Sequence, residues 1–224
     1  MIRAALLLLV LWPAQVWAEC KLALALALDI SASVDNREYR LQIEGLADAI
    51  EHPSVIEAVL TPKDDHIVVA VYEWSGYTDQ QPVIEWSRLD SADAIRAFAA
   101  RLRAHARPQG YLATAIGKAV EFGGALLRAA PPCRRRVLDV SGDGINNIGI
   151  GPQYFYQRGD LDGVIVNGLV ILGATPDPLT YYQREVIFGP GAFVITAESY
   201  TDYRRAMRIK LIREIRPLLI LGEK

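Results

Sequence analysis

Several residue types that carry catalysis or nucleic-acid binding are scarce in this sequence. Its 224 residues include only two cysteines and three histidines, and the histidines lack metal-ligand spacing. There is no Gly-x-Ser-x-Gly elbow, no Ser-x-x-Lys motif and no glycine-rich phosphate loop with its lysine, so neither nucleophilic catalysis nor phosphate binding has a recognisable motif. The 24 basic and 26 acidic residues give a formal charge of −2, which argues against a nucleic-acid binder.

Long apolar runs are also missing after the first 18 residues. Residues 1–18 have the parts of a secretory signal peptide: one positive charge, an apolar core of about nine residues and a small-residue exit at Ala18. An uncleaved anchor is the alternative, but a spanning helix needs ~20 apolar residues. Glu19 is not the small residue that a lipoprotein would carry before Cys20. We therefore predict a signal peptide at 1–18 and a single periplasmic or secreted domain at 19–224, without a membrane span.

The two cysteines occupy matching positions ahead of two aspartates. Cys20 lies nine residues before Asp29, and Cys133 lies ten residues before Asp143, each at the start of a run that ends in an aspartate. If these runs are neighbouring parallel strands, their first residues lie side by side, within the Cα separation of roughly 4.4–6.8 Å that a disulfide needs. The spacing therefore predicts a Cys20–Cys133 disulfide in an exported protein. The alternative is that Cys20 lies in a frayed N-terminus.

Apolar runs that suit strands alternate with amphipathic segments that suit helices. Residues 22–29 carry no charge before the last position, as expected for a strand covered on both faces, and Asp35 is typical of a helix N-cap. The predicted strands are 22–29, 66–75, 82–86, 136–140, 163–172 and 191–196, and the predicted helices are 39–50, 91–104, 112–129, 153–157, 176–186 and 199–219. This alternation predicts a doubly wound α/β fold with a mainly parallel six-stranded sheet, helices on both faces and an antiparallel edge strand at 82–86.

Small oxygen-bearing side chains gather in three loops of this predicted fold. Asp29, Ser31 and Ser33 alternate where the first strand ends, Thr114 lies near the opening of a helix, and Asp143 follows the fourth strand. In open α/β sheets, ligands bind at the edge where the strands end. Two carboxylates and three hydroxyls are hard ligands that suit Mg²⁺, with Mn²⁺ or Ca²⁺ as alternatives. Because only two formal charges surround the dication, an open coordination position would accept a carboxylate from another molecule.

These residues resemble the motifs of the von Willebrand factor type A domain, the integrin I-domain-like fold with a metal-ion-dependent adhesion site. Residues 29–33 read Asp-Ile-Ser-Ala-Ser and match Asp-x-Ser-x-Ser, while Asp143 falls on the aspartate of the third loop, usually found in Thr-Asp-Gly. Thr114 opens a match to Thr-x-Thr-Gly-x-Ala, in which Ile116 replaces the second threonine. The resemblance covers residues 21–221 and is greatest to secreted bacterial members of unassigned function.

The resemblance implies a divalent-cation-dependent module for adhesion or assembly rather than an enzyme. In such a module Ser31, Ser33 and Thr114 contact the metal, Asp29 and Asp143 do so directly or through water, and a Glu or Asp of a protein partner completes the shell. One alternative is a metal-dependent hydrolase that activates water at the same site, although no His or Glu is evident as a general base. The others are a metal-free interaction domain and a domain whose polar loops only cap helices and turns.

A few charged and aromatic residues lie outside this pattern. We interpret Glu73 as a residue at the rim of the loops and Trp74 as a core aromatic, and a role for either in binding is left open. The histidines are interpreted as surface or helix-end residues. The C-terminal basic residues are interpreted as a solvated helix face, with contacts to an anionic partner as the alternative. They are Arg204, Arg205, Arg208, Lys210, Arg213 and Arg216.

Overall fold

The sheet is built around β1 (Cys20–Asp29), in which every residue is buried. The structure is a computed structural model that describes residues 19–63, 65–108 and 113–216. The predicted signal peptide at 1–18 therefore lies outside the described residues. The four leucines of β1 face one side of the sheet, and the alanines between them face the other. A strand that is apolar on both faces needs cover on both, which explains why helices pack on each side.

Six strands form one sheet in the order β3-β2-β1-β4-β5-β6. β1 pairs in parallel with β2 and β4, β4 pairs in parallel with β5, and β5 with β6, whereas β3 is antiparallel to β2. The structure thus confirms the predicted doubly wound α/β fold with its mainly parallel six-stranded sheet and antiparallel edge. The strands after β1 are β2 (His66–Trp74), β3 (Gln80–Leu89), β4 (Arg136–Gly142), β5 (Val164–Ile171) and β6 (Val194–Ala197).

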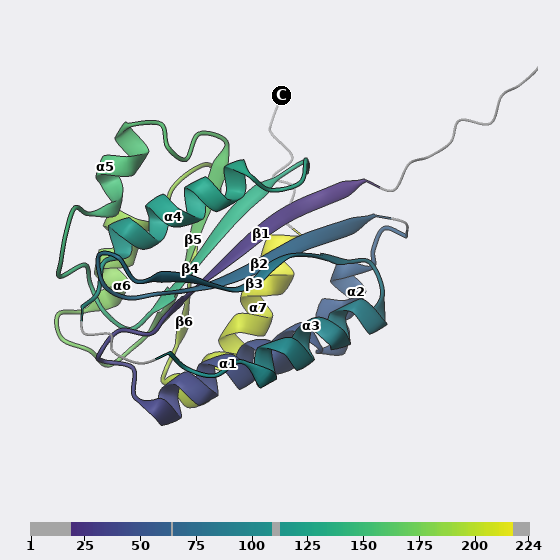
Figure 1. Ribbon diagram of the computed structural model, residues 1–224, viewed down its shortest axis with the longest axis horizontal. Helices are drawn as coiled ribbons and strands as arrows, with labels where there is room; N and C mark the ends of the chain where they lie inside the picture. The colour runs from purple at the N-terminus through teal and green to yellow at the C-terminus, as the bar shows by residue number, and fades with distance from the viewer. Residues whose placement is uncertain (1–18, 64, 109–112, 217–224) are drawn as a thin grey trace, which may run out of the picture.

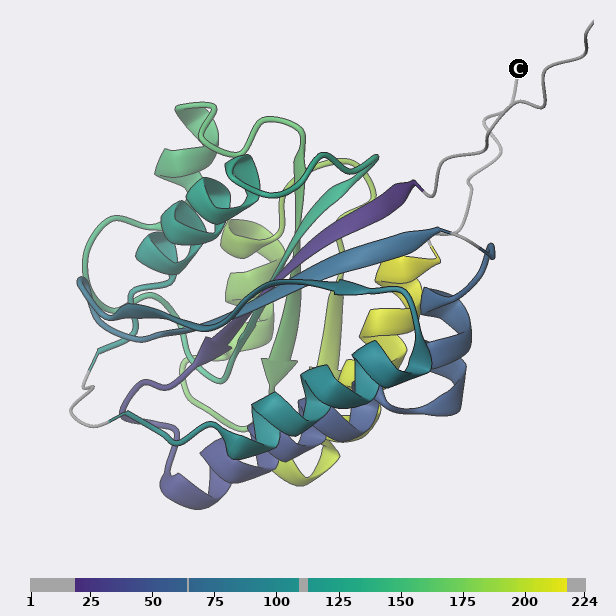
Figure 2. The same ribbon diagram turned by 45° about the vertical axis from the view of Figure 1, so that its right-hand side comes forward.

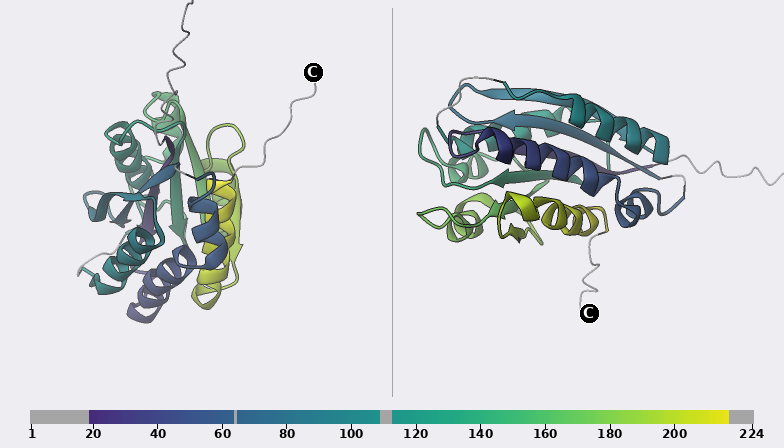
Figure 3. Two further views of the ribbon diagram at one scale, coloured as in Figure 1. Left: turned by 90° about the vertical axis from the view of Figure 1, so that its right-hand side faces the viewer. Right: turned by 90° about the horizontal axis from the view of Figure 1, so that it is seen from below.

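Helices cover both faces of this sheet, as Figures 1 and 2 show. One face carries α1 (Asn36–Ile50), α2 (Pro53–Val59), α3 (Ala92–Ala104) and α7 (Tyr203–Ile215), whose apolar side chains pack with the β1 leucines. The other carries α4 (Ile116–Arg128), α5 (Pro152–Gln157), α6 (Pro178–Tyr181) and a π-helical turn at Tyr182–Val186. The layers are seen from two further sides in Figure 3. Within the described ranges, no helix is long and apolar enough to cross a bilayer.

Side chains cap α1 at Asp35, as predicted, and α3 at Ser91, the first residue of the predicted helix 91–104. The Asp35 carboxylate accepts hydrogen bonds from the backbone N–H groups of Arg37 and Glu38 at 2.7 and 2.8 Å. The Glu38 carboxylate in turn accepts one from the Asp35 N–H at 2.9 Å, which completes a capping box. Ser91 caps α3 by accepting a hydrogen bond from the Ala94 N–H at 3.2 Å. The first cap fixes where the loop after β1 ends and α1 begins.

Some elements differ from their predicted bounds. β3 has ten residues rather than five, because its edge position leaves most of it half-buried or exposed and therefore without an apolar run. α4 begins at Ile116 rather than at residue 112, so Thr114 lies in the loop before the helix. α2 occupies a segment for which the sequence pattern predicts no element. At the C-terminus a 3₁₀ turn at Tyr200–Asp202 precedes α7, and residues 217–219 of the predicted helix lie outside the described residues.

Lys210 on α7 is fully buried, which contradicts its interpretation as part of a solvated helix face. Its ammonium group forms an ion pair with Asp139 on β4 at 3.0 Å and another with Glu214 one turn along α7. Asn167 on β5 donates a hydrogen bond to Glu214 at 2.9 Å. Lys210 can be buried because α7 packs against β5 and β6 and two carboxylates compensate its charge.

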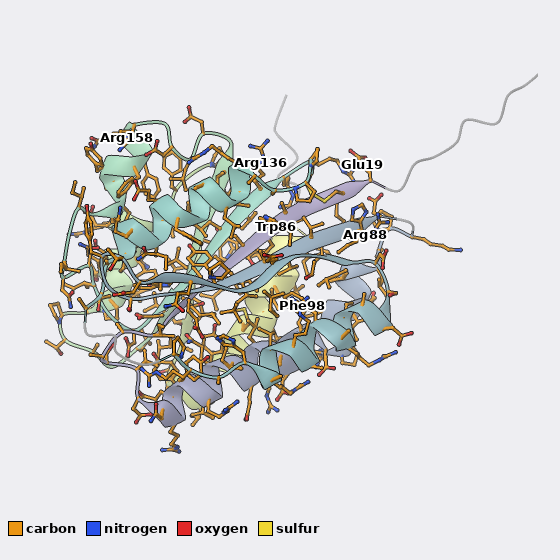
Figure 4. All side chains as sticks on the ribbon, viewed as in Figure 1. Glu19, Trp86, Arg88, Phe98, Arg136 and Arg158 are labelled. Carbon is orange, nitrogen blue, oxygen red and sulfur yellow. A yellow bond between two sulfur atoms is a disulfide. The ribbon has the colours of Figure 1, made fainter. Side chains whose placement is uncertain are left out.

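A disulfide lies at the edge of the sheet where the parallel strands begin. Cys20 at the start of β1 and Cys133 just before β4 form the predicted disulfide, with Cα atoms 4.6 Å apart. The neighbouring strands are parallel, so the two cysteines meet at the same edge, as the spacing predicts. Figure 4 labels Glu19, Arg88 and Arg136 at this end of the sheet.

Both ends of the described chain lie at this same edge. The His66 N–H at the start of β2 donates a hydrogen bond to the Glu19 carbonyl at 3.1 Å. The Arg135 guanidinium, just before β4, donates to the carbonyl of Glu214 in the last turn of α7 at 2.5 Å. The opposite edge, where β1, β2 and β4 end, is therefore remote from both ends of the described chain.

Candidate metal centre

The three loops with the predicted oxygen ligands meet at the edge where β1, β2 and β4 end. Asp29 is the last residue of β1, and Asp143 directly follows β4. The strand order reverses at this point, because β2 lies on one side of β1 and β4 lies on the other. The loop before α4 reaches the same edge, since the Ala115 N–H donates to the carbonyl of Ser75, just after β2, at 2.7 Å. Open α/β sheets bind ligands at such a switch point.

Consecutive hydrogen bonds join four of the five predicted ligands. The Ser31 N–H donates to Asp29 Oδ1 at 2.8 Å, and the hydroxyl oxygens of Ser31 and Ser33 lie 3.2 Å apart. The Ser33 hydroxyl then donates to Asp143 Oδ1 at 2.7 Å. Side chains from two loops that are far apart in the sequence therefore form one polar cluster at the end of the sheet.

Thr114 lies beside this cluster, and no hydrogen bond of the described residues joins its side chain to the other four. A Cβ atom added to Gly144 would lie 3.9 Å from Thr114 Oγ1, so the hydroxyl is next to the backbone that follows Asp143. Asn147 holds the threonine: its N–H donates to the Thr114 carbonyl at 2.9 Å, and its side-chain oxygen accepts from the Thr114 N–H at 2.8 Å. All five predicted residues thus lie at one edge, four in direct contact and Thr114 adjoining them.

Asp29 is completely buried, and its Oδ2 atom has no hydrogen-bond partner among the described residues. Burial raises the pKa of Asp29 to about 7, and the charge of Asp143 adds to this effect. Hydrogen bonds from Ser31 and from the Asp143 backbone oppose the shift only in part. A cation between the two carboxylates would favour their ionised forms.

The donor set fits a hard divalent cation that keeps some ligands from outside the chain. In the part of the chain that the structure describes, no group of three or more His, Cys, Asp and Glu side chains could hold a metal ion. The candidate centre instead combines two carboxylates with three hydroxyls. Such a set suits a cation that binds oxygen and retains water. The unpaired Oδ2 of Asp29 is a buried polar atom that needs a partner, and a bound cation could supply one.

Tyr182 and Gly142 lie directly behind Asp29. Tyr182 is fully buried, its hydroxyl has no partner among the described residues, and burial followed by the charge of Asp29 raises its pKa. A Cβ atom at Gly142 would lie 2.6 Å from the Tyr182 hydroxyl and 2.9 Å from Asp29 Oδ2, so only glycine fits there. Sequence reasoning missed Tyr182 because it belongs to a helical pattern and is one of ten tyrosines.

Arg107 contacts the loop that carries Ser31 and Ser33. Its guanidinium donates to the carbonyl of Val34 at 2.5 Å and to that of Ile30 at 3.4 Å, at the two ends of the loop. It also donates to the Asn36 side chain at 3.0 Å. The sequence holds no signal for these contacts, since Arg107 follows α3 and is more than 70 positions away from the loop.

Glu73 is fully buried, so its interpretation as a residue at the rim of the loops is wrong. Its carboxylate accepts a hydrogen bond from the Tyr39 hydroxyl at 2.6 Å and lies 3.2 Å from His105 Nε2. Burial raises the pKa of Glu73. The reason for the error is that α1 and the segment after α3 cover the end of β2. Trp74 is buried, as predicted for a core aromatic.

A groove of about 330 Å³ borders the centre at Asp143. Its walls include Glu38 in the first turn of α1, Gly173 after β5 and Tyr200 before α7. Tyr200 is buried, and its pKa is raised by burial and by the charges of Asp143 and Asp29. The groove exposes the Asp143 side of the centre to molecules in solution.

One family model matches the chain over all of the residues that the structure describes. The match covers residues 19–219, and the family is described as "Protein of unknown function (DUF1194)". No curated protein matches the sequence.

Solved structures with the same fold are similar at low sequence identity. Proximal thread matrix protein 1 (PTMP1) from the mussel byssus, in a form with a zinc-occupied MIDAS motif, has a TM-score of 0.58 at 14% identity, over 88% of this chain and 49% of that one. A von Willebrand factor type A protein from Catenulispora acidiphila gives 0.59 at 15%, over 88% and 43%. The pilus adhesin SpaC from Lactobacillus rhamnosus GG gives 0.59 at 14%, over 88% and 30%. This chain therefore spans about half or less of their length, and the likeness confirms the von Willebrand factor type A fold.

Proposed function

Because the chain belongs to the family described as protein of unknown function (DUF1194) and has the von Willebrand factor type A fold, we propose that it is an exported protein-binding module that depends on a divalent cation. Mg²⁺ is the proposed cation, and a Glu or Asp side chain of a protein partner is the proposed ligand from outside. The residues proposed to hold the cation are Asp29, Ser31, Ser33, Thr114 and Asp143. A periplasmic or secreted location is part of the proposal and is supported by the signal-peptide pattern and the disulfide.

The observation that carries the proposal is the buried and unpaired Oδ2 atom of Asp29. A buried carboxylate oxygen without a partner is costly, and the cost is greater because Asp143 repels it. Ser31 and Ser33 fix the relative positions of the two aspartates by hydrogen bonds. This arrangement holds acidic oxygens ready for a cation, whose positive charge would then attract a partner carboxylate.

Two of the similar structures support a binding role of this kind. PTMP1 has a zinc-occupied MIDAS motif, and SpaC is a pilus adhesin. Zn²⁺ therefore belongs in the test beside Mg²⁺ and Mn²⁺. A metal-dependent hydrolase would need a general base, and none of the described His or Glu side chains bonds to the cluster.

Calorimetric titration of the full chain with Mg²⁺, Mn²⁺ and Zn²⁺ tests the proposal. We expect the wild type to bind at one site and Asp29→Asn to weaken the affinity about 100-fold, because a negative charge at the site is lost. Without metal, Asp29→Asn should melt at a higher temperature than the wild type, because a buried repulsive charge is removed. Asp79→Asn, in the turn between β2 and β3, is the matched control and should bind metal normally.

Absence of metal-linked heat and of any thermal shift in the wild type would contradict the proposal. Capture of partners from an envelope extract, with and without a chelator, then tests whether binding depends on the cation. Turnover of phosphoester or peptide substrates that Asp29→Asn abolishes would instead favour the hydrolase.

A further inference from the structure

Three large apolar side chains are exposed close to the candidate metal centre. Tyr77 lies in the turn between β2 and β3 and is 49% exposed, while Ile148 and Ile150 lie in the loop after β4 and are 43% and 49% exposed. A Cβ atom added to Gly149 would lie 3.0 Å from the Tyr77 ring, so this ring packs on the backbone between the two isoleucines. We call these three residues the apolar platform.

The loop that presents the platform is held in place. Asn146 accepts a hydrogen bond from the Gly117 N–H at 3.1 Å and donates to the carbonyls of Ile148 and Gly149 at 3.1 and 3.4 Å. A Cβ atom at Gly117 would lie 1.9 Å from the Ile150 carbonyl oxygen, so the loop rests directly on the start of α4. The exposure of the isoleucines therefore belongs to a fixed loop conformation.

The platform is continuous with the candidate metal centre. The loop with Ile148 and Ile150 also carries Asp143, and Asn147, immediately before Ile148, is hydrogen-bonded to Thr114. Lys118 lies with its Nζ atom 4.6 Å from the centre of the Tyr77 ring and is already ion-paired with Glu121. The surface beside the metal site therefore offers apolar contact, and the Lys118 ammonium at its border is paired with Glu121.

We propose that the platform binds an aliphatic or aromatic side chain of the same partner segment whose carboxylate binds the metal. The partner is then a protein segment with an acidic residue close in sequence to a large apolar residue. This inference rests on the proposed function, because the metal site determines where the carboxylate sits. An exposed apolar surface next to a polar site is typical of a protein interface.

Selection from a random peptide display library, with the full-length protein as bait in Mn²⁺, tests the inference. We expect enriched peptides to contain Asp or Glu within a few positions of Leu, Ile, Val or Phe. The double variant Ile148→Ser/Ile150→Ser should bind a selected peptide about tenfold more weakly, because apolar contact is lost, with an unchanged Mn²⁺ affinity. Tyr77→Ala should act in the same direction. Ile209→Ser is the matched control, since Ile209 is exposed on α7, and it should bind the peptide normally.

Other results would contradict the apolar platform, its link to the metal or the proposed function itself. Acidic peptides without apolar residues, or peptides that the platform variants bind normally, would overturn the platform and leave metal-dependent binding intact. Apolar peptides that bind equally in a chelator would overturn the link between platform and metal. If the wild type binds no Mn²⁺ in calorimetry, the proposed function fails, and this inference fails with it.

Discussion

Arg107 shows how a single side chain outside the predicted ligand set can control the geometry of the centre. It bonds the carbonyls at both ends of the loop with Ser31 and Ser33, and its guanidinium lies over the Tyr39 ring at 5.6 Å. Tyr39 is itself bonded to the buried Glu73. The loop is thus connected to the end of β2 through side chains that do not reach the proposed metal.

We predict that Arg107→Ala weakens Mn²⁺ binding about tenfold, which is a typical effect of losing a group that orients metal ligands. Calorimetric titration measures the affinity, and thermal melting without metal measures the stability. Arg107→Lys should recover only part of the affinity, because an ammonium group cannot reproduce the planar pattern of donors.

Arg103→Ala provides the control for this prediction. Arg103 is an arginine at the end of α3 that forms ion pairs with Asp48 and Glu51 on the surface. Its loss should leave Mn²⁺ affinity unchanged. If Arg107→Ala lowers the melting temperature and the metal affinity stays the same, Arg107 has a structural role only.

At this scale the sequence predicts the residues that share a local pattern. Asp29, Ser31 and Ser33 are detectable because they alternate at the end of one apolar run. Arg107 and Tyr182 are not, because their contacts join distant segments and leave no periodic signal. The structure differs from the prediction at Glu73 for a related reason, since a charge near a strand end suggests exposure to solvent unless the covering helix is known.

The α7 helix has a buried face that is partly charged. Lys210 and Glu214 on this face meet Asp139 on β4, so one ammonium lies among two carboxylates. Burial raises the pKa of Asp139 to about 7, the charge of Glu214 adds to this, and Lys210 opposes it. Asp139 also contributes to the raised pKa of Tyr203 on α7 and of Tyr72 on β2.

This pKa shift predicts how stability changes with pH. The folded state retains the Asp139 proton to a higher pH than the unfolded chain, so the contribution of Asp139 to stability is full below about pH 4 and is lost as pH rises towards 7. We therefore expect the stability of the wild type relative to Asp139→Asn to fall by about 3 kcal/mol between pH 4 and pH 7. Urea unfolding across this range measures the difference.

The prediction is tested by how the stability difference between the two proteins changes with pH. Its absolute value is not the test, because Asp139→Asn also removes a partner of Lys210 at every pH. A difference in stability that is constant with pH would show that Asp139 is ionised in the folded protein throughout. Asp177→Asn is not a suitable control, because Asp177 caps α6. Asp93→Asn, whose residue is exposed in the first turn of α3, is a better one.

Elements are predicted well where periodicity is strong and poorly where they are short. β1, β2 and β5 are long apolar runs, and the sequence pattern locates them to within a residue or two. α2 has seven residues and follows α1 almost directly, so it adds no separate pattern. The buried polar face of α7 resembles a solvated face in sequence, because charge that is neutralised inside a protein looks the same as charge in water.

The whole molecule has a covalent link at one edge of the sheet and the candidate centre at the other. The Cys20–Cys133 disulfide connects residues separated by 113 positions. It closes a loop that runs from the start of β1 to the segment just before β4. A crosslink across so long a loop restricts the unfolded chain strongly. It does so without contact to the loops that carry the proposed ligands.

We predict that Cys20→Ser/Cys133→Ser lowers the free energy of unfolding by about 4 kcal/mol. Urea unfolding of the double variant and the oxidised wild type measures this difference. Mn²⁺ affinity should stay within about twofold at temperatures where both proteins are folded, because the disulfide lies at the opposite edge. A large loss of metal affinity in the folded variant would show that the two edges are coupled.

At the scale of the fold, the sequence predicts more than at the scale of single contacts. Alternating apolar and amphipathic segments are enough to predict the doubly wound sheet, and the matched positions of Cys20 and Cys133 indicate that β1 and β4 are neighbours. The order of β5 and β6 and the groove beside Asp143 depend on side-chain packing that no short pattern encodes.

The positions of Glu19 and Arg216 have a practical consequence for handling the protein. Both lie at the edge remote from Asp29 and Asp143, so attachment to a solid support near either of them would leave the candidate centre pointing outward. The protein should therefore show the same affinity for a partner in solution whether it is attached to a biosensor chip near Glu19 or near Arg216.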